Sequence, residues 1–77
     1  MEINTLKRLR GERGMKIKEL AKQSGVSIAT ISAIENNKRK AQIATLGNLA
    51  RALDVPLNAL LEFLDTGGPD RGRIRHL

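Results

Sequence analysis

Residues 17–34 (IKELAKQSGVSIATISAI) carry the pattern that most restricts how this chain can fold. Their apolar spacing predicts two short amphipathic helices separated by a turn at residues 24–26. Gly25 suits this turn because glycine adopts a positive φ at little steric cost. Ser27 suits the start of the second helix because its hydroxyl oxygen can accept a hydrogen bond from a free backbone N–H. The residues expected on the buried sides are Leu20 and Ala21 in the first helix, and Ile31 and Ile34 in the second.

Two helices joined by a short glycine turn form a helix-turn-helix, which can place its second helix in the major groove of DNA. The charge distribution agrees with this interpretation. Residues 1–53 carry eleven Lys and Arg against four acidic residues, whereas residues 54–77 carry three Arg against four acidic residues. Phosphate contacts supply most non-specific affinity for nucleic acid, so the basic segment predicts a polyanionic partner. The alternative is that these cations only solubilise helix faces.

The composition excludes several other classes of protein. Seventy-seven residues allow one small domain, and a single aromatic residue, Phe63, argues against single-strand or RNA binding, where bases stack on aromatic side chains. Without cysteine, and with His76 as the single histidine, no metal site or cofactor is expected. There is no membrane-length apolar run and no signal peptide, so we expect a cytoplasmic protein. No catalytic set of residues is recognisable, so no enzyme is expected, and Glu12 and Glu19 are interpreted as ordinary surface residues.

The apolar pattern along the whole chain predicts an all-α domain of five helices over residues 1–65, followed by a flexible basic tail over residues 66–77. The first helix is expected from residue 4 or 5 to residue 13, and the others over about 17–24, 27–36, 43–53 and 57–64. Thr45 is a possible cap of the fourth helix. The fifth helix is very apolar for its length, so we expect part of it to contact a second copy of the chain; filling its own core is the alternative. Its candidate interface residues are Leu57, Leu60, Leu61, Phe63 and Leu64.

Two further groups of charged residues predict specific contacts, one with phosphate and one within the chain. Lys38, Arg39 and Lys40 directly follow the predicted reading helix, which favours a phosphate-binding loop over a merely solvated one. Arg10 falls at the edge of the apolar stripe of the first helix, where a charge needs a partner. Glu35, late in the third helix, is the best candidate for an ion pair; independent solvation of both is the alternative.

Three segments in this order resemble the XRE family of prokaryotic and phage repressors, whose DNA-binding domains are of the lambda-repressor type. The segments are LKRLRGERGM, KELAKQSGVSIATISAIENNKRK and TLGNLARALDVPLNALL, and the resemblance covers residues 4–64. It implies a compact five-helix domain with the helix-turn-helix at the second and third helices. It also implies a homodimeric transcriptional regulator, a repressor, that binds double-stranded DNA at a pseudo-palindromic operator.

The resemblance also implies roles for single residues. Arg10 and Glu35 match a family pair that ties the first helix to the third. Ile17 matches a position often held by a phosphate-contacting glutamine, and Lys16 replaces the usual Ser or Thr cap while still offering a charge to phosphate. The positions that match base-facing residues are Ser27, Ile28, Ala29, Ser32 and Ala33, with Thr30 adding a hydroxyl, and those that match the phosphate-binding loop are Asn36, Lys38 and Lys40, beside Arg39.

The predicted reading face departs from the family pattern, because Ile28, Ala29 and Ala33 cannot form bidentate hydrogen bonds with purines. Direct readout should therefore be thin, and specificity should depend on dimer spacing, DNA shape or bridging water. Two alternatives to an operator-binding regulator stay open. One is an antitoxin-type autoregulator whose C-terminal tail binds a partner protein. The other is a protein-interaction module that has lost DNA binding.

Overall fold

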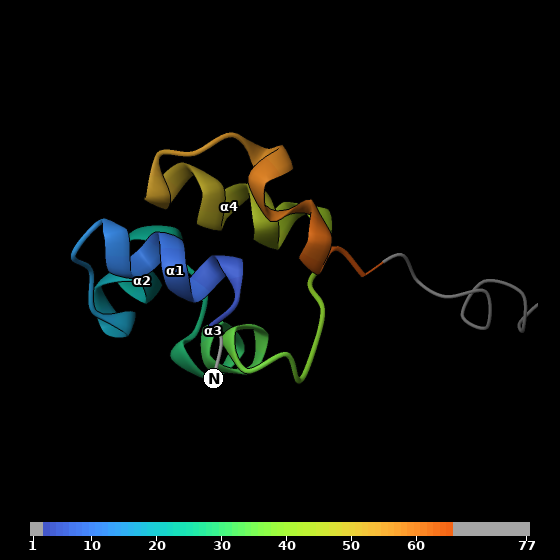
Figure 1. The fold of residues 1–77 in the computed structure, drawn as a ribbon, viewed down its shortest axis with the longest axis horizontal. Coiled ribbons are helices and arrows are strands. Elements are labelled where there is room, and N and C mark those ends of the chain that lie inside the picture. The colour runs from blue at the N-terminus through green and yellow to red at the C-terminus, as the bar shows by residue number, and fades with distance from the viewer. Residues whose placement is uncertain (1–2, 66–77) are drawn as a thin grey trace, which may run out of the picture.

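The computed structural model describes residues 3–65, so the predicted tail over residues 66–77 lies outside the described part of the chain. Five helices follow one another: α1 (Thr5–Glu12), α2 (Ile17–Ser24), α3 (Ile28–Glu35), α4 (Ile43–Leu53) and the 3₁₀ helix η1 (Leu57–Phe63). In Figure 1, α4 and η1 form one side of the molecule and α3 lies on the opposite side, with α1 and α2 between them. None of the helices in residues 3–65 has the length and apolar character needed to cross a membrane.

The turn between α2 and α3 has the backbone geometry that the sequence predicts. Gly25 ends α2 in the left-handed region, at a φ of 76°, and its N–H donates to the carbonyl oxygen of Ala21 over 2.9 Å. The buried Ser24 hydroxyl donates to the Leu20 carbonyl oxygen at 2.6 Å and accepts from the Val26 N–H at 3.1 Å. Ser24 therefore satisfies backbone groups on both sides of the turn, which fixes the direction in which α3 leaves.

Arg13 caps the C-terminal end of α4, a role that its place in the α1 pattern does not suggest. Its Nε donates to the Leu53 carbonyl oxygen at 2.6 Å, and its Nη2 donates to the Asp54 carbonyl oxygen at 3.2 Å. A cation at this end satisfies unpaired carbonyl groups and offsets the negative end of the helix dipole. At the other end of α4 the expected cap is wrong: Gln42 occupies the N-cap position, and Thr45 lies within the helix.

The core draws on every helix. Burying one such Leu or Ile side chain contributes about 1.5–3 kcal/mol before the entropy of ordering is subtracted. The packing explains why each helix shows a one-sided apolar stripe. The fully buried side chains are Leu6, Leu20, Ile31, Ile34, Leu46, Leu49, Leu53 and Leu60.

The last helix, η1, differs from the predicted α-helix. It is a 3₁₀ helix, and its three residues per turn place Leu60 and Phe63 on one face, where both are buried in the core of the single chain. The interface prediction is therefore wrong for Leu60 and Phe63. Leu57 and Leu61 are exposed, by 37% and 42%, and Leu64 is half-buried.

A short backbone pairing joins the end of η1 to the segment before α4. The Ala41 N–H donates to the Phe63 carbonyl oxygen, and the Asp65 N–H donates to the Ala41 carbonyl oxygen, each over 2.8 Å. Ala41 and Leu64 thus form an isolated parallel bridge. The side chain of Glu62 adds a bond to the start of α1, because it accepts from the Thr5 hydroxyl at 2.9 Å.

Candidate nucleic-acid interface

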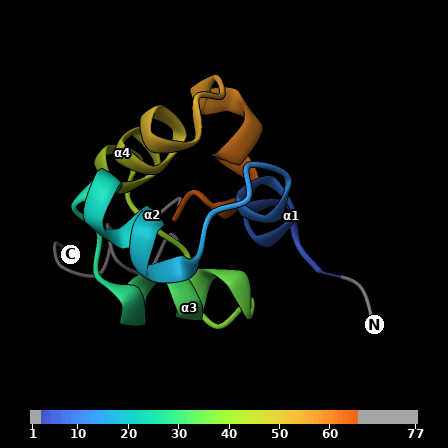
Figure 2. The same cartoon turned by 90° about the vertical axis from the view of Figure 1, so that its left-hand side faces the viewer.

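Helix α3 lies at an edge of the fold, with α1 and α2 on its inner side in both views (Figures 1 and 2). Its inward residues Ile31, Ile34 and Glu35 are buried. Its first turn is open to solvent: Ser27, Ile28 and Ala29 are exposed, and the Ile28 side chain is exposed by 47%. The structure places the other three predicted base-facing residues, Thr30, Ser32 and Ala33, in half-buried positions.

Most polar groups on this outward side of α3 are already hydrogen-bonded within the chain. The Ser27 hydroxyl caps the helix by accepting from the Thr30 N–H at 3.1 Å, and it donates to the Thr30 hydroxyl oxygen at 2.9 Å. The Asn36 amide donates to the carbonyl oxygen and hydroxyl of Ser32, at 2.9 and 3.3 Å. The face therefore offers fewer free polar groups to a base than its composition suggests.

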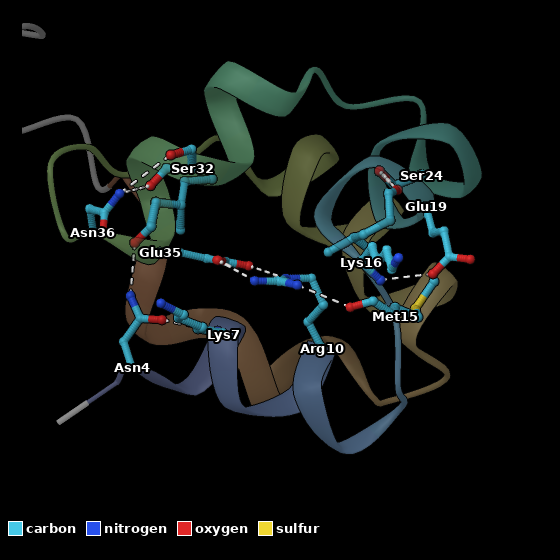
Figure 3. A network of polar contacts seen from close by, with 12 residues as sticks. Asn4, Lys7, Arg10, Met15, Lys16, Glu19, Ser24, Ser32, Glu35 and Asn36 are labelled. Carbon is cyan, nitrogen blue, oxygen red and sulfur yellow. Dashed lines mark hydrogen bonds and ion pairs between the residues drawn. The ribbon is translucent and has the colours of Figure 1, made fainter.

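The ion pair expected between Arg10 and Glu35 is present and ties α3 to α1 (Figure 3). It is bidentate: Nε donates to Oε2 at 2.7 Å and Nη2 donates to Oε1 at 2.9 Å. The third guanidinium nitrogen, Nη1, donates to the Met15 carbonyl oxygen at 3.0 Å. The hydrogen bond with Glu35 raises the pKa of Arg10 above its ordinary value, against the opposing effect of burial. The Arg10 charge is therefore retained at any pH at which the domain is used.

Asn4 makes a second connection between α1 and α3 that the sequence did not reveal (Figure 3). Its Oδ1 caps α1 by accepting from the Lys7 N–H at 3.1 Å. Its Nδ2 donates to the Ile34 carbonyl oxygen at 2.8 Å and to Asn37 Oδ1 at 3.0 Å. One side chain thus caps the start of α1 and the end of α3, and it orients the loop that follows α3. The signal in the sequence is only an asparagine before a helix, which does not show the second set of partners.

The N-terminal end of α2 brings Lys16 and Ile17 to the surface in different ways. The Lys16 side chain is exposed, whereas Ile17 is half-buried against the core. As expected, the Lys16 side chain does not cap the helix; instead Glu19 Oε1 accepts from the Lys16 N–H at 2.7 Å. Glu19 is exposed, as expected of a surface residue, and it also caps α2, a role that the sequence did not reveal. The backbone N–H groups of Ile17 and Lys18 have no partner among residues 3–65, which leaves donors directed outward at a positive helix end.

The loop after α3 carries Lys38, Arg39 and Lys40, all exposed, and it extends to the same side of the molecule as α3 (Figure 1). Its path is set by the Lys38 N–H, which donates to the Ala33 carbonyl oxygen at 2.8 Å, and by Asn37 at a φ of 59°. The Lys40 ammonium donates one hydrogen bond, of 2.9 Å, to the Glu62 carbonyl oxygen. Lys40 is therefore anchored to η1, and two of its three N–H donors are left for another group.

A hollow of about 430 Å³ separates the start of α3 from the start of α4. Its lining includes Ser27 and Thr30 of α3, Arg39 and Lys40 of the basic loop, and Asp65. The hollow is open and mainly polar, so it continues the exposed surface of α3 toward the basic loop.

A comparison with known protein families matches residues 6–60 to the helix-turn-helix family. The chain belongs to the XRE-type helix-turn-helix family. This match includes α2, the glycine turn and α3, and it confirms the family that the sequence resembles.

Two proteins with similar sequences are named as HTH-type transcription regulators. The chain is 40% identical over 57 residues to the HTH-type transcriptional regulator SutR of Escherichia coli (strain K12), covering 74% of this chain and 32% of SutR. It is 47% identical over 57 residues to the HTH-type transcriptional repressor RghR of Bacillus subtilis (strain 168), covering 73% of this chain and 42% of RghR. The matched segment thus spans less than half the length of either relative.

The crystal structure of an HTH_3 family transcriptional regulator from Vibrio cholerae matches this helix-turn-helix domain with a TM-score of 0.71 and 36% sequence identity. The match covers 77% of this chain and 33% of that chain. The predicted fold class, a compact all-α helix-turn-helix domain, is confirmed.

Proposed function

We propose that this chain is a sequence-specific double-stranded DNA-binding transcriptional regulator, a repressor, that acts as a homodimer with α3 in the major groove of a pseudo-palindromic operator. The observation that carries the proposal is the surface around α3. Its exposed first turn lies at the edge of the fold (Figure 2), and two cationic features flank the helix-turn-helix along the chain: Lys16 before α2 and the loop of residues 38–40 after α3. The names of SutR and RghR, a transcriptional regulator and a transcriptional repressor, support the same function.

The two cationic features are suited to contact the phosphates on either side of the groove. At the start of α2, the exposed Lys16 ammonium accompanies the free N–H groups of Ile17 and Lys18, and a helix N-terminus of this kind favours an anion. Ile17 would act here through its backbone, because its side chain packs on the core. In the loop, Lys38 and the remaining donors of Lys40 would contact phosphate. Asn36 would do so only after its amide releases Ser32.

Base readout by α3 itself should be sparse. Ile28 and Ala29 can contact thymine methyl groups, whereas the hydroxyls of Ser27 and Thr30 bond first to each other. Each bidentate contact that is missing forgoes about 1–3 kcal/mol of discrimination between bases. Spacing between two half-sites and DNA shape would therefore supply a large share of specificity.

Homodimerisation would rest on the exposed part of η1. Leu57, Leu61 and the half-buried Leu64 remain available after Leu60 and Phe63 are assigned to the core. A two-fold axis through this patch would relate two copies of α3, and operator half-sites read by such dimers lie roughly 34 Å apart. Substituting Leu61→Lys should shift the sedimentation of the protein toward monomer while far-UV circular dichroism stays unchanged. Identical sedimentation of both proteins as dimers would exclude this patch as the interface.

Duplex binding at increasing salt concentration tests the DNA-binding proposal. The affinity should fall steeply, because each phosphate contact adds about 0.9 to the slope of log affinity against log salt. The variant Lys38→Ala should lower affinity for all sequences alike and reduce the slope by about one contact. Arg51→Ala is the matched control, since it removes the same charge from α4, the helix that lies on the side of the molecule opposite α3 (Figure 1).

The outcomes separate this function from its alternatives. Absent or salt-independent duplex binding by folded protein would exclude an operator-binding regulator and favour a protein-interaction module. An equal effect of Lys38→Ala and Arg51→Ala would exclude the proposed orientation on DNA. For the antitoxin-type alternative, removing residues 66–77 should abolish capture of a partner protein and leave duplex binding intact.

A further inference from the structure

We propose that Arg39 reads a guanine at the edge of each half-site, so that base discrimination comes from the loop after α3 as well as from α3. The inference rests on the proposed DNA-binding function and assigns to Arg39 a role that differs from the general phosphate contact expected of the basic loop.

The arginine side chains of residues 3–65 differ sharply in how they are used. Four of the five are hydrogen-bonded within the chain, and in two of these, Arg10 and Arg13, the bonds join two helices or hold a helix end. Among the described residues, the Arg39 guanidinium has neither a hydrogen bond nor an ion pair. The four hydrogen-bonded arginines and their partners are Arg8 with Glu12, Arg10 with Glu35 and Met15, Arg13 with Leu53 and Asp54, and Arg51 with Asn48.

The position of Arg39 distinguishes it from its two lysine neighbours. It lines the hollow that begins at Ser27 and Thr30, next to the first turn of α3. Lys38 does not line that hollow; Lys40 does, but its ammonium donates to the Glu62 carbonyl oxygen of η1. With the start of α3 in the major groove, Arg39 is therefore the cation beside this hollow whose charged group has no hydrogen bond within the described residues.

The Arg39 guanidinium and the major-groove edge of guanine have complementary hydrogen-bonding groups. A guanidinium group presents parallel N–H donors in one plane, which match the O6 and N7 acceptors that guanine exposes in the major groove. The outward face of α3 provides no such fork, because Ile28, Ala29 and Ala33 are apolar and the Asn36 amide donates to Ser32. Arg39 is exposed and has no structural bond to lose, so binding a base costs the fold nothing beyond the ordering of its side chain.

The test compares the base preferences of the wild-type chain with those of Arg39→Lys and Arg39→Met. Duplexes selected from a random pool by the wild-type chain should share a guanine at one symmetric position in each half-site. Replacing this guanine should weaken binding by about 5- to 150-fold, the range for a bidentate contact. Arg39→Lys keeps the charge but lacks the planar fork, so it should reduce that penalty, and Arg39→Met should abolish it, while the salt dependence of Arg39→Lys stays unchanged. Lys38→Ala, the control, should weaken binding to every sequence and keep the guanine preference.

Three results would overturn the assignment. If Arg39→Met retains the full guanine preference, Arg39 does not contact the guanine. If the substitution removes a preference for A·T-rich sequence, the wild-type Arg39 guanidinium lies in a narrow minor groove and not on guanine. If the folded wild-type chain binds no duplex, the proposed function and this inference fail together, whereas wild-type binding with unchanged preference in Arg39→Met overturns the inference alone.

Discussion

Replacing Arg10 with methionine tests how α3 is held to α1. The substitution removes two hydrogen bonds to Glu35, of 2.7 and 2.9 Å, and a third to the Met15 carbonyl oxygen. Methionine keeps part of the apolar packing of the arginine stem. The Glu35 side chain is 5% exposed, so its carboxylate would remain nearly buried without a counter-charge.

Removing one partner of a buried ion pair destabilises a protein by about 3–5 kcal/mol. The Arg10 side chain is 16% exposed, and water therefore reaches part of the pair, which favours the lower end of this range, about 3 kcal/mol. A 77-residue domain has a total stability of roughly 4–12 kcal/mol, so the variant should lose a quarter or more of it. Breaking the pair should therefore lower the free energy of unfolding, whatever the intact pair adds to it.

Urea unfolding followed by far-UV circular dichroism measures this loss. The double variant Arg10→Met/Glu35→Leu removes both charges and should be close to the wild type in stability, because apolar residues often replace a buried ion pair without cost. A loss below about 1 kcal/mol in Arg10→Met, or a double variant as unstable as the single one, would show that Glu35 does not depend on Arg10 as its counter-charge. The same samples show whether DNA binding depends on this support of α3.

Three further substitutions test local features of the fold by thermal or urea unfolding. Gly25→Ala should cost about 1–2 kcal/mol through the backbone alone, because a Cβ there meets no atom within 4 Å while φ is positive; a neutral effect would contradict the left-handed turn. Ser27→Ala should cost about 1 kcal/mol, since the Thr30 N–H loses its acceptor, and an unchanged stability would argue against the cap. Asn4→Asp keeps the cap of α1 and loses the donor to Ile34, so it should cost about 1–3 kcal/mol, and Asn4→Ser, which retains a donor, should cost less.

The features that the sequence predicted well are local ones. The positive φ of Gly25, the cap at Ser27 and the bounds of α2 depend on residues within one or two turns of each other. The Arg10–Glu35 pair spans 25 residues and was expected because an arginine beside an apolar stripe needs a partner and because the family resemblance supplied one. The roles of individual residues toward DNA remain predictions.

The contacts that the sequence did not reveal join distant segments through single polar atoms. Arg13 with the end of α4 and Asn4 with the end of α3 are separated by 40 and 30 residues, and neither leaves a periodic signal. Seven residues of η1 are too few for apolar spacing to separate a 3₁₀ helix from an α-helix, so the faces of Leu60 and Phe63 were assigned wrongly. Glu19 was missed because a carboxylate near a helix start is common on surfaces and reveals a cap only with its backbone partner.

The backbone bridge between Ala41 and Leu64 has a consequence for how this protein can be varied. Its two hydrogen bonds use amide groups that every residue except proline carries, so they impose little restriction on the side chains nearby. The charges at residues 38 and 39 can therefore be changed in kind and number while the loop follows the same path, whereas Lys40 is held to η1 by its ammonium. If the loop binds DNA as proposed, these two positions allow its affinity and sequence preference to be altered with little effect on stability.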